Sequence, residues 1–312
     1  MLRKFSFIIF ILALFLSACA PVAMPTPTLQ PDPSMQVYTD ALGSTVTIYG
    51  KPTRIVSLAP SVTEILFAIG AGPQVVGRTK FCNYPAEVSS LPEIGGFSAK
   101  SISVEAILDL NPDLVVAGSK SQQDGVATLQ AQGITVYTLA PSTLADIEAG
   151  IRTLGEITGN TAGADKVVAG MQTRIEAVTA RVKTIPAEKR LRIFYEVWHE
   201  PLTTTTQSTF IGELLMLAGG VNIFNDLNDT YPEVSAEQIL ESDPQAIIGP
   251  SSHSDQLTAQ VIAARSGWDK LTAVKNGAIY IVDAESVSRA GPRVVDALES
   301  IARSLYPDLF EQ

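Results

Sequence analysis

Apolar and polar positions alternate along this chain in the way that is typical of strands joined by helices. Short apolar runs at Arg54–Leu58, Leu114–Ala117 and Thr135–Leu139 predict buried strands, and longer stretches of helical character separate them. Ser61-Val62-Thr63-Glu64 has the form of a capping box at a helix start, and Gly70 is placed to end that helix. Because alternating strands and helices favour a mainly parallel sheet covered on both faces, we expect an α/β fold.

A second series of elements follows a long helical stretch. Residues 160–183 predict one long helix, with Asn160 at its start and Pro186 beyond its end. The alternation then resumes with further strands, and Arg293–Leu305 predicts a closing helix. We therefore expect two similar α/β lobes joined by a single long helix. The predicted parts are an N-terminal lobe at 37–158, a linking helix at 159–185 and a C-terminal lobe at 186–312.

One segment occurs twice. Residues 102–116 align without gaps on residues 234–248, and each copy has a serine, a glutamate two positions later, a proline and an apolar run. This order predicts a capped short helix followed by a buried strand, with Glu105 and Glu237 in the first helical turns, where the helix dipole favours a carboxylate. Either glutamate could be a simple helix-start residue, although that explains less well why both lobes carry one.

The position of a ligand site follows from this organisation. Ligands on open α/β sheets bind outside the carboxyl ends of the strands, and two such lobes present those ends to one cleft. The cleft between the lobes is therefore the expected site.

The first residues have the features of a targeting segment. Arg3 and Lys4 precede the apolar run Phe5–Leu16, whose length as a helix is about 18 Å, short of the roughly 30 Å of a bilayer core. The run ends in Leu16-Ser17-Ala18-Cys19, which resembles the lipobox of bacterial lipoproteins. Residues 1–18 are then a signal peptide and Cys19 the lipidated residue. An ordinary secretory signal or a short membrane anchor is the alternative. The proline-rich residues 19–36 predict an extended tether.

Composition narrows the function classes. The chain has 312 residues, of which 46% are hydrophobic and 17% charged, with a formal net charge of −10. Such a chain can bury a large core, and its acidic balance argues against a nucleic-acid partner. Two cysteines and two histidines do not supply a zinc cage, so no metal site is expected. Cys82, the thiol left after lipidation, is expected to be a buried or pocket-wall residue rather than a nucleophile.

Motifs for catalysis or nucleotide binding are missing from the sequence. Neither a GxSxG elbow nor a phosphate-binding loop nor a dinucleotide-binding loop occurs. A Ser–His–Asp triad is not placed by any pattern. We therefore expect a binding protein without a cofactor of its own, not an enzyme.

Aromatic and basic residues in the turns after strands are the best candidates for ligand contacts. Aromatic faces on two sides of a cleft suit a large flat ligand, and an arginine suits carboxylates or phosphate on its edge. Each aromatic taken alone could equally be a core residue. His199 could be an axial ligand to haem iron or cobalt, a hydrogen-bonding wall residue or a surface side chain. The candidate ligand-binding residues are Phe81, Tyr84, Phe97, Trp198, His199, Tyr231 and Arg289.

Several motifs in order resemble a known family. They are Arg54–Leu66, Asn111–Val115, Ala218–Phe224 and Gly291–Arg293. Over about residues 37–308 the chain resembles the ABC-importer binding proteins for cobalamin, iron-siderophores and haem. The tyrosine–proline turn and the spacing around Glu105 are most similar to the cobalamin-binding branch. The resemblance implies the helical-backbone periplasmic binding protein fold, with two lobes bridged by one long helix.

The resemblance also implies roles for individual residues. Glu105 and Glu237 match the glutamates that dock onto arginines of the permease in that branch. Phe81, Tyr84, Phe97 and Tyr231 fall at or near the pocket aromatics, and Arg289 corresponds to a pocket arginine.

These observations together predict an acylated, extracytoplasmic substrate-binding protein of an ABC importer. It would be a monomer held on the membrane by its lipid, would capture a corrinoid, cobalamin, and would deliver it to the permease and its ATPase subunit. The same fold could instead take haem or a ferric siderophore. An extracytoplasmic hydrolase, or a lipoprotein that only binds partners, is the more distant alternative.

Overall fold

The computed structural model describes residues 35–251 and 257–310. The predicted signal peptide, the lipidation site Cys19 and residues 19–34 of the predicted tether lie outside the described residues. Met35 and Gln36, which the sequence assigns to the tether, already belong to strand β1 (Met35–Thr39), because they pair with Tyr49 and Ile48 of β2 (Thr45–Tyr49) in an antiparallel ladder.

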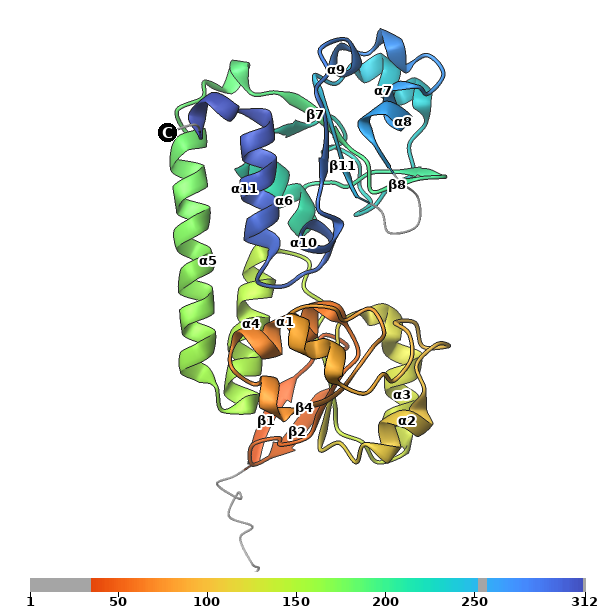
Figure 1. The fold of residues 1–312 in the computed structure, drawn as a ribbon, viewed down its shortest axis with the longest axis vertical. Helices are drawn as coiled ribbons and strands as arrows, with labels where there is room; N and C mark the ends of the chain where they lie inside the picture. The colour runs from red at the N-terminus through yellow and green to blue at the C-terminus, as the bar shows by residue number, and fades with distance from the viewer. Residues whose placement is uncertain (1–34, 252–256, 311–312) are drawn as a thin grey trace, which may run out of the picture. The chain divides into compact units, whose positions relative to one another are not determined.

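The N-terminal lobe contains a four-stranded parallel sheet in the order β4-β3-β5-β6 (Figure 1). The strands are β3 (Ile55–Ser57), β4 (Val75–Arg78), β5 (Leu114–Ala117) and β6 (Val136–Thr138), and the accompanying helices are α1 (Pro60–Ala68), α2 (Val104–Asp109) and α3 (Gln123–Ala131). Short apolar runs are buried strands here, as the sequence predicts.

One detail of the predicted N-terminal lobe is wrong. The expected capping box at Ser61–Glu64 does not form, because α1 starts at Pro60, with Ala59 as N-cap and no side-chain cap. Proline is favoured in the first helical turn, since its fixed φ suits the helix and its missing N–H is not needed there. Glu64 is therefore an interior residue of α1, and its side chain is available for contacts outside the helix.

The C-terminal lobe repeats the parallel arrangement, with strand order β10-β7-β11-β12. Its strands are β7 (Arg192–Tyr195), β10 (Val221–Asn222), β11 (Ala246–Pro250) and β12 (Ile279–Val282). Its helices are α6 (Phe210–Leu217), α7 (Ala236–Ser242), α8 (Ala259–Ala263), α9 (Thr272–Lys275), α10 (Ala284–Ser288) and α11 (Val294–Leu305). A small antiparallel hairpin, β8 (Trp198–His199) and β9 (Leu202–Thr203), was not predicted.

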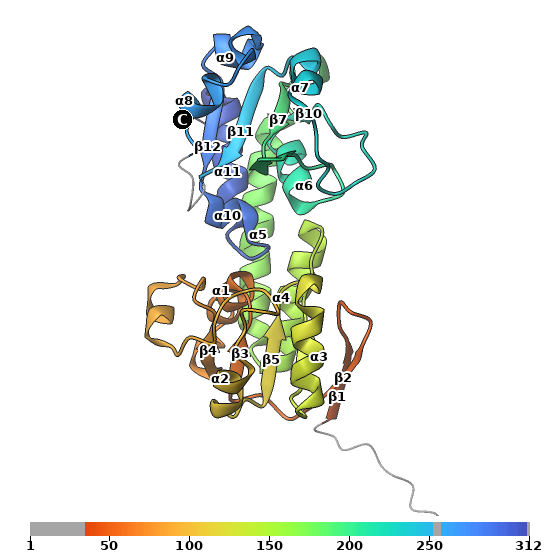
Figure 2. The same cartoon turned by 90° about the vertical axis from the view of Figure 1, so that its right-hand side faces the viewer.

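The predicted long helix is confirmed as α5 (Thr161–Val182), and a second helix packs along it. This is α4 (Leu144–Thr158), which turns into α5 at Gly159, a residue in the left-handed region with φ 71° (Figures 1 and 2). The start of α4 reaches the C-terminal lobe, where the Leu144 amide donates to the Glu213 carboxylate at 2.6 Å. The long helix α5 therefore links the two lobes, as the sequence predicts, and α4 packs along it with its first residue bonded to the C-terminal lobe.

The lobes also share a hydrophobic core. One continuous cluster of buried side chains includes Val116 of the first sheet, Leu154 of α4, Met171 of α5, Leu214 of α6 and Ile248 of the second sheet. Two further clusters cover the other face of each sheet. The buried surface crosses from lobe to lobe, so its hydrophobic stabilisation opposes their separation. In the described part of the chain, every helix is too short or too polar to span a bilayer.

Candidate ligand-binding site

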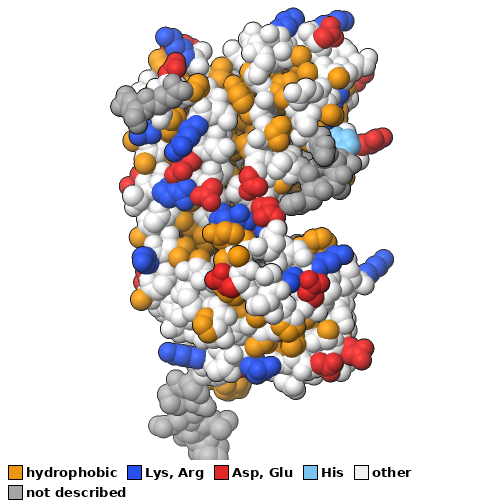
Figure 3. All heavy atoms as spheres, viewed as in Figure 1, with side chains coloured by type: hydrophobic (Ala, Val, Ile, Leu, Met, Phe, Trp, Pro, Cys, Tyr) orange, Lys and Arg blue, Asp and Glu red, His pale blue; other side chains and the backbone are white. Residues whose placement is uncertain are grey.

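A cavity of about 400 Å³ lies at the boundary of the two lobes. From the N-terminal lobe it is lined by the turns that follow β3 and β5 and by Phe81 and Phe97. From the C-terminal lobe it is lined by Phe210 at the start of α6 and by Ser288, Arg289 and Ala290 at the end of α10. The wall on the first side is thus formed at the carboxyl ends of parallel strands, where ligands of α/β sheets bind. Figure 3 shows the recess between the lobes on the right of the view.

A second cavity of about 400 Å³ adjoins the first and shares Gly118, Ser119, Pro141 and Phe210 with it. Lys120 and Tyr231 are among the residues that complete its lining. Burial raises the pKa of the Tyr231 phenol, which therefore stays protonated at neutral pH. Each volume falls in the range of small-molecule sites, and the shared wall makes one extended recess.

Local packing explains why the cavity walls have this shape. At Gly118 a side-chain Cβ would lie 2.4 Å from the Cβ of Ala59, so the turns after β5 and β3 approach closely only because residue 118 is glycine. The buried Gln122 side-chain amide donates to the carbonyl oxygens of Leu58 and Phe97, both at 2.8 Å. These bonds hold the β3 turn and the Phe97 loop in fixed relation.

The structure brings four of the seven predicted ligand residues to this recess. Phe81, Phe97 and Arg289 line the first cavity and Tyr231 lines the second. Tyr84 is half exposed and lies outside the lining of both cavities. The centre of its ring is 4.2 Å from the Cζ atom of Arg293, which stacks over the ring.

Trp198 and His199 are also outside both linings. Their rings lie 5.5 Å apart on β8, and the Trp198 indole donates to the Glu200 carbonyl oxygen at 2.8 Å. Within residues 35–251 and 257–310, no group of three or more histidine, cysteine, aspartate or glutamate side chains is arranged to hold a metal ion.

Sequence reasoning missed Phe210, which lines both cavities. It is the first residue of α6 and follows the N-cap Thr209, whose hydroxyl accepts from the Gly212 amide at 3.0 Å. An aromatic residue directly after a helix cap at a lobe boundary is the signal that could have identified it.

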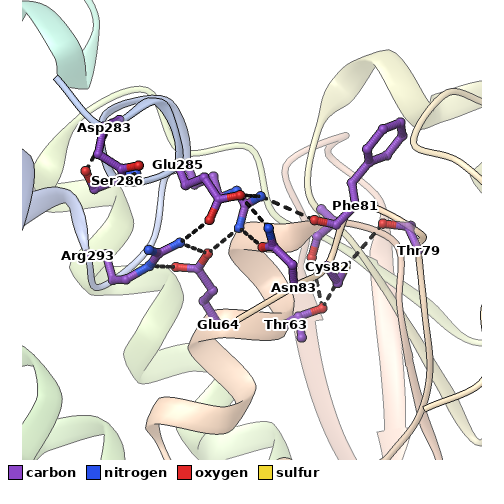
Figure 4. A network of polar contacts seen from close by, with 12 residues as sticks. Thr63, Glu64, Thr79, Phe81, Cys82, Asn83, Asp283, Glu285, Ser286 and Arg293 are labelled. Carbon is purple, nitrogen blue, oxygen red and sulfur yellow. Dashed lines mark hydrogen bonds and ion pairs between the residues drawn. The ribbon is translucent and has the colours of Figure 1, made fainter. Parts of the chain in front are cut away.

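An ion-pair cluster crosses the lobe boundary beside the first cavity (Figure 4). Glu64 of α1 accepts from Arg289 at 2.9 Å, and from Arg293 through two hydrogen bonds of 2.9 and 2.7 Å. Glu64 is only 3% exposed. Hydrogen bonding to Glu64 raises the pKa of Arg293 above its usual range. The two lobes are thus joined by a buried carboxylate that serves two guanidinium groups.

The Arg289 guanidinium is fully engaged with the protein at both terminal nitrogens. One nitrogen donates to Glu64 and to the Asn83 side chain at 2.8 Å, and the other to the Phe81 carbonyl oxygen at 3.3 Å and to Glu285 at 3.1 Å. The sequence predicts that this arginine contacts ligand. The structure places it at the cavity wall, with its hydrogen bonds directed to protein acceptors.

Asp283 adds a further carboxylate near Arg293. Burial by itself would raise the pKa of Asp283, but hydrogen bonds from Ser286 and the charge of Arg293 hold that pKa below its ordinary value. Asp283 also caps α10, since it accepts from the Ser286 amide at 2.8 Å. It is therefore ionised at neutral pH.

Cys82 lies next to this cluster and is buried. Its sulfur lies 3.1 Å from the Thr63 hydroxyl and 3.2 Å from the Thr79 hydroxyl (Figure 4). Cys82 is therefore a buried thiol held among protein hydroxyls, as the sequence predicts.

The repeated segment forms the same structure in both lobes, as predicted. The Ser103 and Ser235 hydroxyls each accept from a backbone amide three residues on, at 3.2 Å, and so cap α2 and α7. Glu105 and Glu237 both lie in the first turn, and for Glu237 hydrogen bonds from its own amide and from Ser235 lower the carboxyl pKa. Figure 1 shows α2 and α7 on the same side of α5.

Matching arginine contacts and matching backbone turns hold these two helices in place. Arg54 donates to the carbonyl oxygens at the end of α2 and Arg192 to the Ser242 carbonyl oxygen at the end of α7. Asn111 and Asp243, which follow the two helices, both have positive φ, at 44° and 40°. The two carboxylates are thus presented by equivalent, firmly anchored turns.

Comparisons with known proteins agree with this architecture. Residues 55–286 match the family model described as periplasmic binding protein. The uncharacterized ABC transporter substrate-binding lipoprotein YvrC of Bacillus subtilis is 34% identical over 278 residues, covering 88% of this chain and 86% of the relative.

Two solved structures extend the comparison. The periplasmic vitamin B12-binding protein BtuF of Vibrio cholerae superposes with a TM-score of 0.69 at 30% identity, covering 84% of this chain and 99% of that chain. The periplasmic heme-binding protein RhuT of Roseiflexus sp. RS-1 has a TM-score of 0.72 at 24% identity, covering 83% and 100% of the two chains, a likeness of fold.

Proposed function

Since this chain belongs to the periplasmic binding protein family, we propose that it is the lipid-anchored substrate-binding protein of an ABC importer and that its ligand is a corrinoid, cobalamin. The family binds solutes for transport and is not a family of enzymes. In this proposal Cys19 carries the lipid, the chain acts as a monomer on the outer side of the cytoplasmic membrane, and it needs no cofactor of its own.

The observation that carries the proposal is the aromatic lining of the recess from both lobes. Phe81 and Phe97 face it from the N-terminal lobe, and Phe210 and Tyr231 from the C-terminal lobe. Such a recess suits a large ligand with broad apolar faces, which gains by burial and stacking on both sides. The vitamin B12-binding relative, 30% identical over most of this chain, supports a corrinoid in particular.

Delivery to the permease is assigned to Glu105 and Glu237. Both are exposed, both are anchored at capped helix starts, and both helices lie on one side of α5 in Figure 1. A surface ion pair contributes about 0–1 kcal/mol, so two separated carboxylates would fix the orientation of the docked protein more than its affinity.

Little lobe closure is expected when ligand binds. The paired helices α4 and α5, the shared core and the Glu64 cluster all oppose a change in the angle between the lobes. Arg174 of α5 adds contacts to Asp296 at 2.6 Å and Glu299 at 2.8 Å on α11. The cleft would therefore bind in a largely preformed state.

Haem is the second candidate, because a phenol lies in the recess. Tyr231 lines the second cavity, where its phenol could contact a haem iron. His199, the other candidate iron ligand, lies outside the lining of both cavities. The position of His199 outside the recess favours a corrinoid.

Titration of the purified mature chain with cyanocobalamin, hemin and a ferric hydroxamate tests the proposal. We expect saturable binding of cyanocobalamin in calorimetry, and no shift of the hemin absorption bands of the kind that axial ligation produces. Tight binding of hemin or of the ferric hydroxamate without binding of cyanocobalamin would refute the corrinoid assignment and leave the transport role with another ligand.

A further inference from the structure

The ion-pair cluster between the lobes has a charge balance that bears on ligand choice. Arg289 and Arg293 supply two positive charges, and Glu64 and Glu285 contact them with two carboxylates. Asp283 interacts with Arg293 as a third carboxylate. Although two arginines stand beside the cavity, the three carboxylates outnumber them, and these five side chains together carry one net negative charge.

Glu64 is the residue on which this balance depends. It contacts both guanidinium groups from the opposite lobe, and its side chain is almost fully buried. Charges in such a site interact more strongly than in water, since screening is weak there. Removing this carboxylate would therefore make the cluster more positive by one unit of charge, and would leave Arg289, which lines the cavity, with Glu285 as its remaining ion-pair partner among these residues.

Two lysines near the recess differ from the two arginines in being exposed to solvent. Lys120 lines the second cavity and the Lys80 ammonium lies 5.1 Å from the centre of the Phe81 ring, but both lysines are exposed to solvent. Their charges are screened by salt, whereas the cluster is shielded from it. The electrostatic character of the cavity wall is therefore set mainly by the cluster.

We propose that Glu64 determines the charge selectivity of the cleft. Together with Glu285 and Asp283, Glu64 outweighs the positive charge of Arg289 and Arg293, so the recess accepts large ligands without ionised carboxylates and discriminates against ligands that carry them. This deepens the proposed function, on which it rests in one respect: cyanocobalamin, a neutral corrinoid, is a ligand of the favoured class.

A matched pair of probes measures this selectivity without relying on cobalamin. Protoporphyrin IX carries two carboxylates, and its dimethyl ester carries none. We expect the wild-type chain to favour the ester, and Glu64→Gln to shift the ratio of the two affinities toward the acid by about tenfold, the effect of one poorly screened charge near the ligand. Fluorescence titration of both probes gives the ratio directly.

Glu196→Gln is the matched control. Glu196 is 1% exposed and accepts two hydrogen bonds from Arg265, at 2.5 and 2.7 Å, but both residues belong to the C-terminal lobe and neither lines the cavities. It loses a buried carboxylate of the same kind, so it should lose similar thermal stability while leaving the ratio unchanged.

A compensated variant separates charge from folding. Glu64→Gln combined with Arg289→Gln restores the charge balance and should bring the ratio back toward the wild-type value, even if both variants are less stable. The proposal is overturned if Glu64→Gln and Glu196→Gln change the ratio alike, if the double variant does not restore it, or if Glu64→Gln still does not bind the acid. Failure of the wild-type chain to bind cyanocobalamin would instead refute the proposed function, since the ester-to-acid ratio is independent of it.

Discussion

Truncating Phe81 should weaken ligand binding by an amount that the structure allows us to calculate. The Phe81 side chain lines the first cavity and is 49% exposed in the absence of ligand. A phenylalanine presents roughly 200 Å² in all, so about 100 Å² of this ring is available to a ligand. At about 25 cal/mol per Å² that surface contributes about 2.5 kcal/mol, of which an alanine would retain a small part. Phe81→Ala should therefore raise the Kd for cyanocobalamin by about 30-fold, corresponding to about 2 kcal/mol.

Isothermal titration calorimetry of Phe81→Ala and Tyr49→Ala gives the comparison. Tyr49 is a still more exposed aromatic, at 67%, but it lies on β2 and lines neither cavity, so its removal should leave the Kd unchanged. If Phe81→Ala binds within about twofold of wild type, a free-energy change of only about 0.4 kcal/mol, the ligand does not contact this wall and the assignment of the recess is wrong.

Three further predictions concern docking, pH dependence and the shared core. Charge reversal by Glu105→Arg with Glu237→Arg should abolish uptake of labelled cyanocobalamin by cells that carry the cognate permease, with unchanged affinity in calorimetry; Glu241→Arg, an exposed change on α7, is the control, and an equal loss of affinity in the double variant would place the pair in the ligand site or the fold. Burial alone would raise the pKa of Asp146, but hydrogen bonds at the start of α4 hold it below its ordinary value of 3.8. The unfolded state then binds the proton more readily, so the stabilisation is present above that value and is lost as the pH falls through the lowered pKa. Asp146→Ala should cost about 1 kcal/mol in urea unfolding at neutral pH and progressively less in acid, and a cost independent of pH would contradict this. Leu154→Ala, at a fully buried position of α4, should cost about 2–5 kcal/mol and keep a single calorimetric transition, because the core is continuous; two separate transitions would show that the lobes unfold independently.

The strands and the long helix could be predicted because their signal is local. A buried parallel strand such as β5 is apolar at every position. The ends of α5 are marked in the sequence by Asn160 before the helix and Pro186 after it. The hairpin β8–β9 was missed because its strands have two residues each, too few for a period to be seen. The packing of α4 along α5 was missed for a different reason, since it depends on tertiary contacts that no local pattern contains.

The residues of the binding site divide in the same way, into those with a local sequence signal and those without one. Phe81 and Phe97 were found because they follow strands in polar turns, whereas Phe210 resembles an ordinary core residue at a helix start. The contacts of Arg289 were out of reach, because its partner Glu64 lies 225 positions away in the sequence and was assigned to a helix cap. Spatial neighbours from different lobes leave no trace in a single sequence.

The serine caps and arginine contacts that α2 and α7 share have a consequence for recognition. A receptor assembled from two identical subunits would meet nearly the same short helix on either side, and could seat this molecule in two orientations related by a half-turn. Asymmetry must then come from parts without a counterpart, such as the β8–β9 ribbon, which pairs only within the C-terminal half. Grafting or deleting that ribbon would reveal whether the docked complex adopts one orientation or a mixture of both.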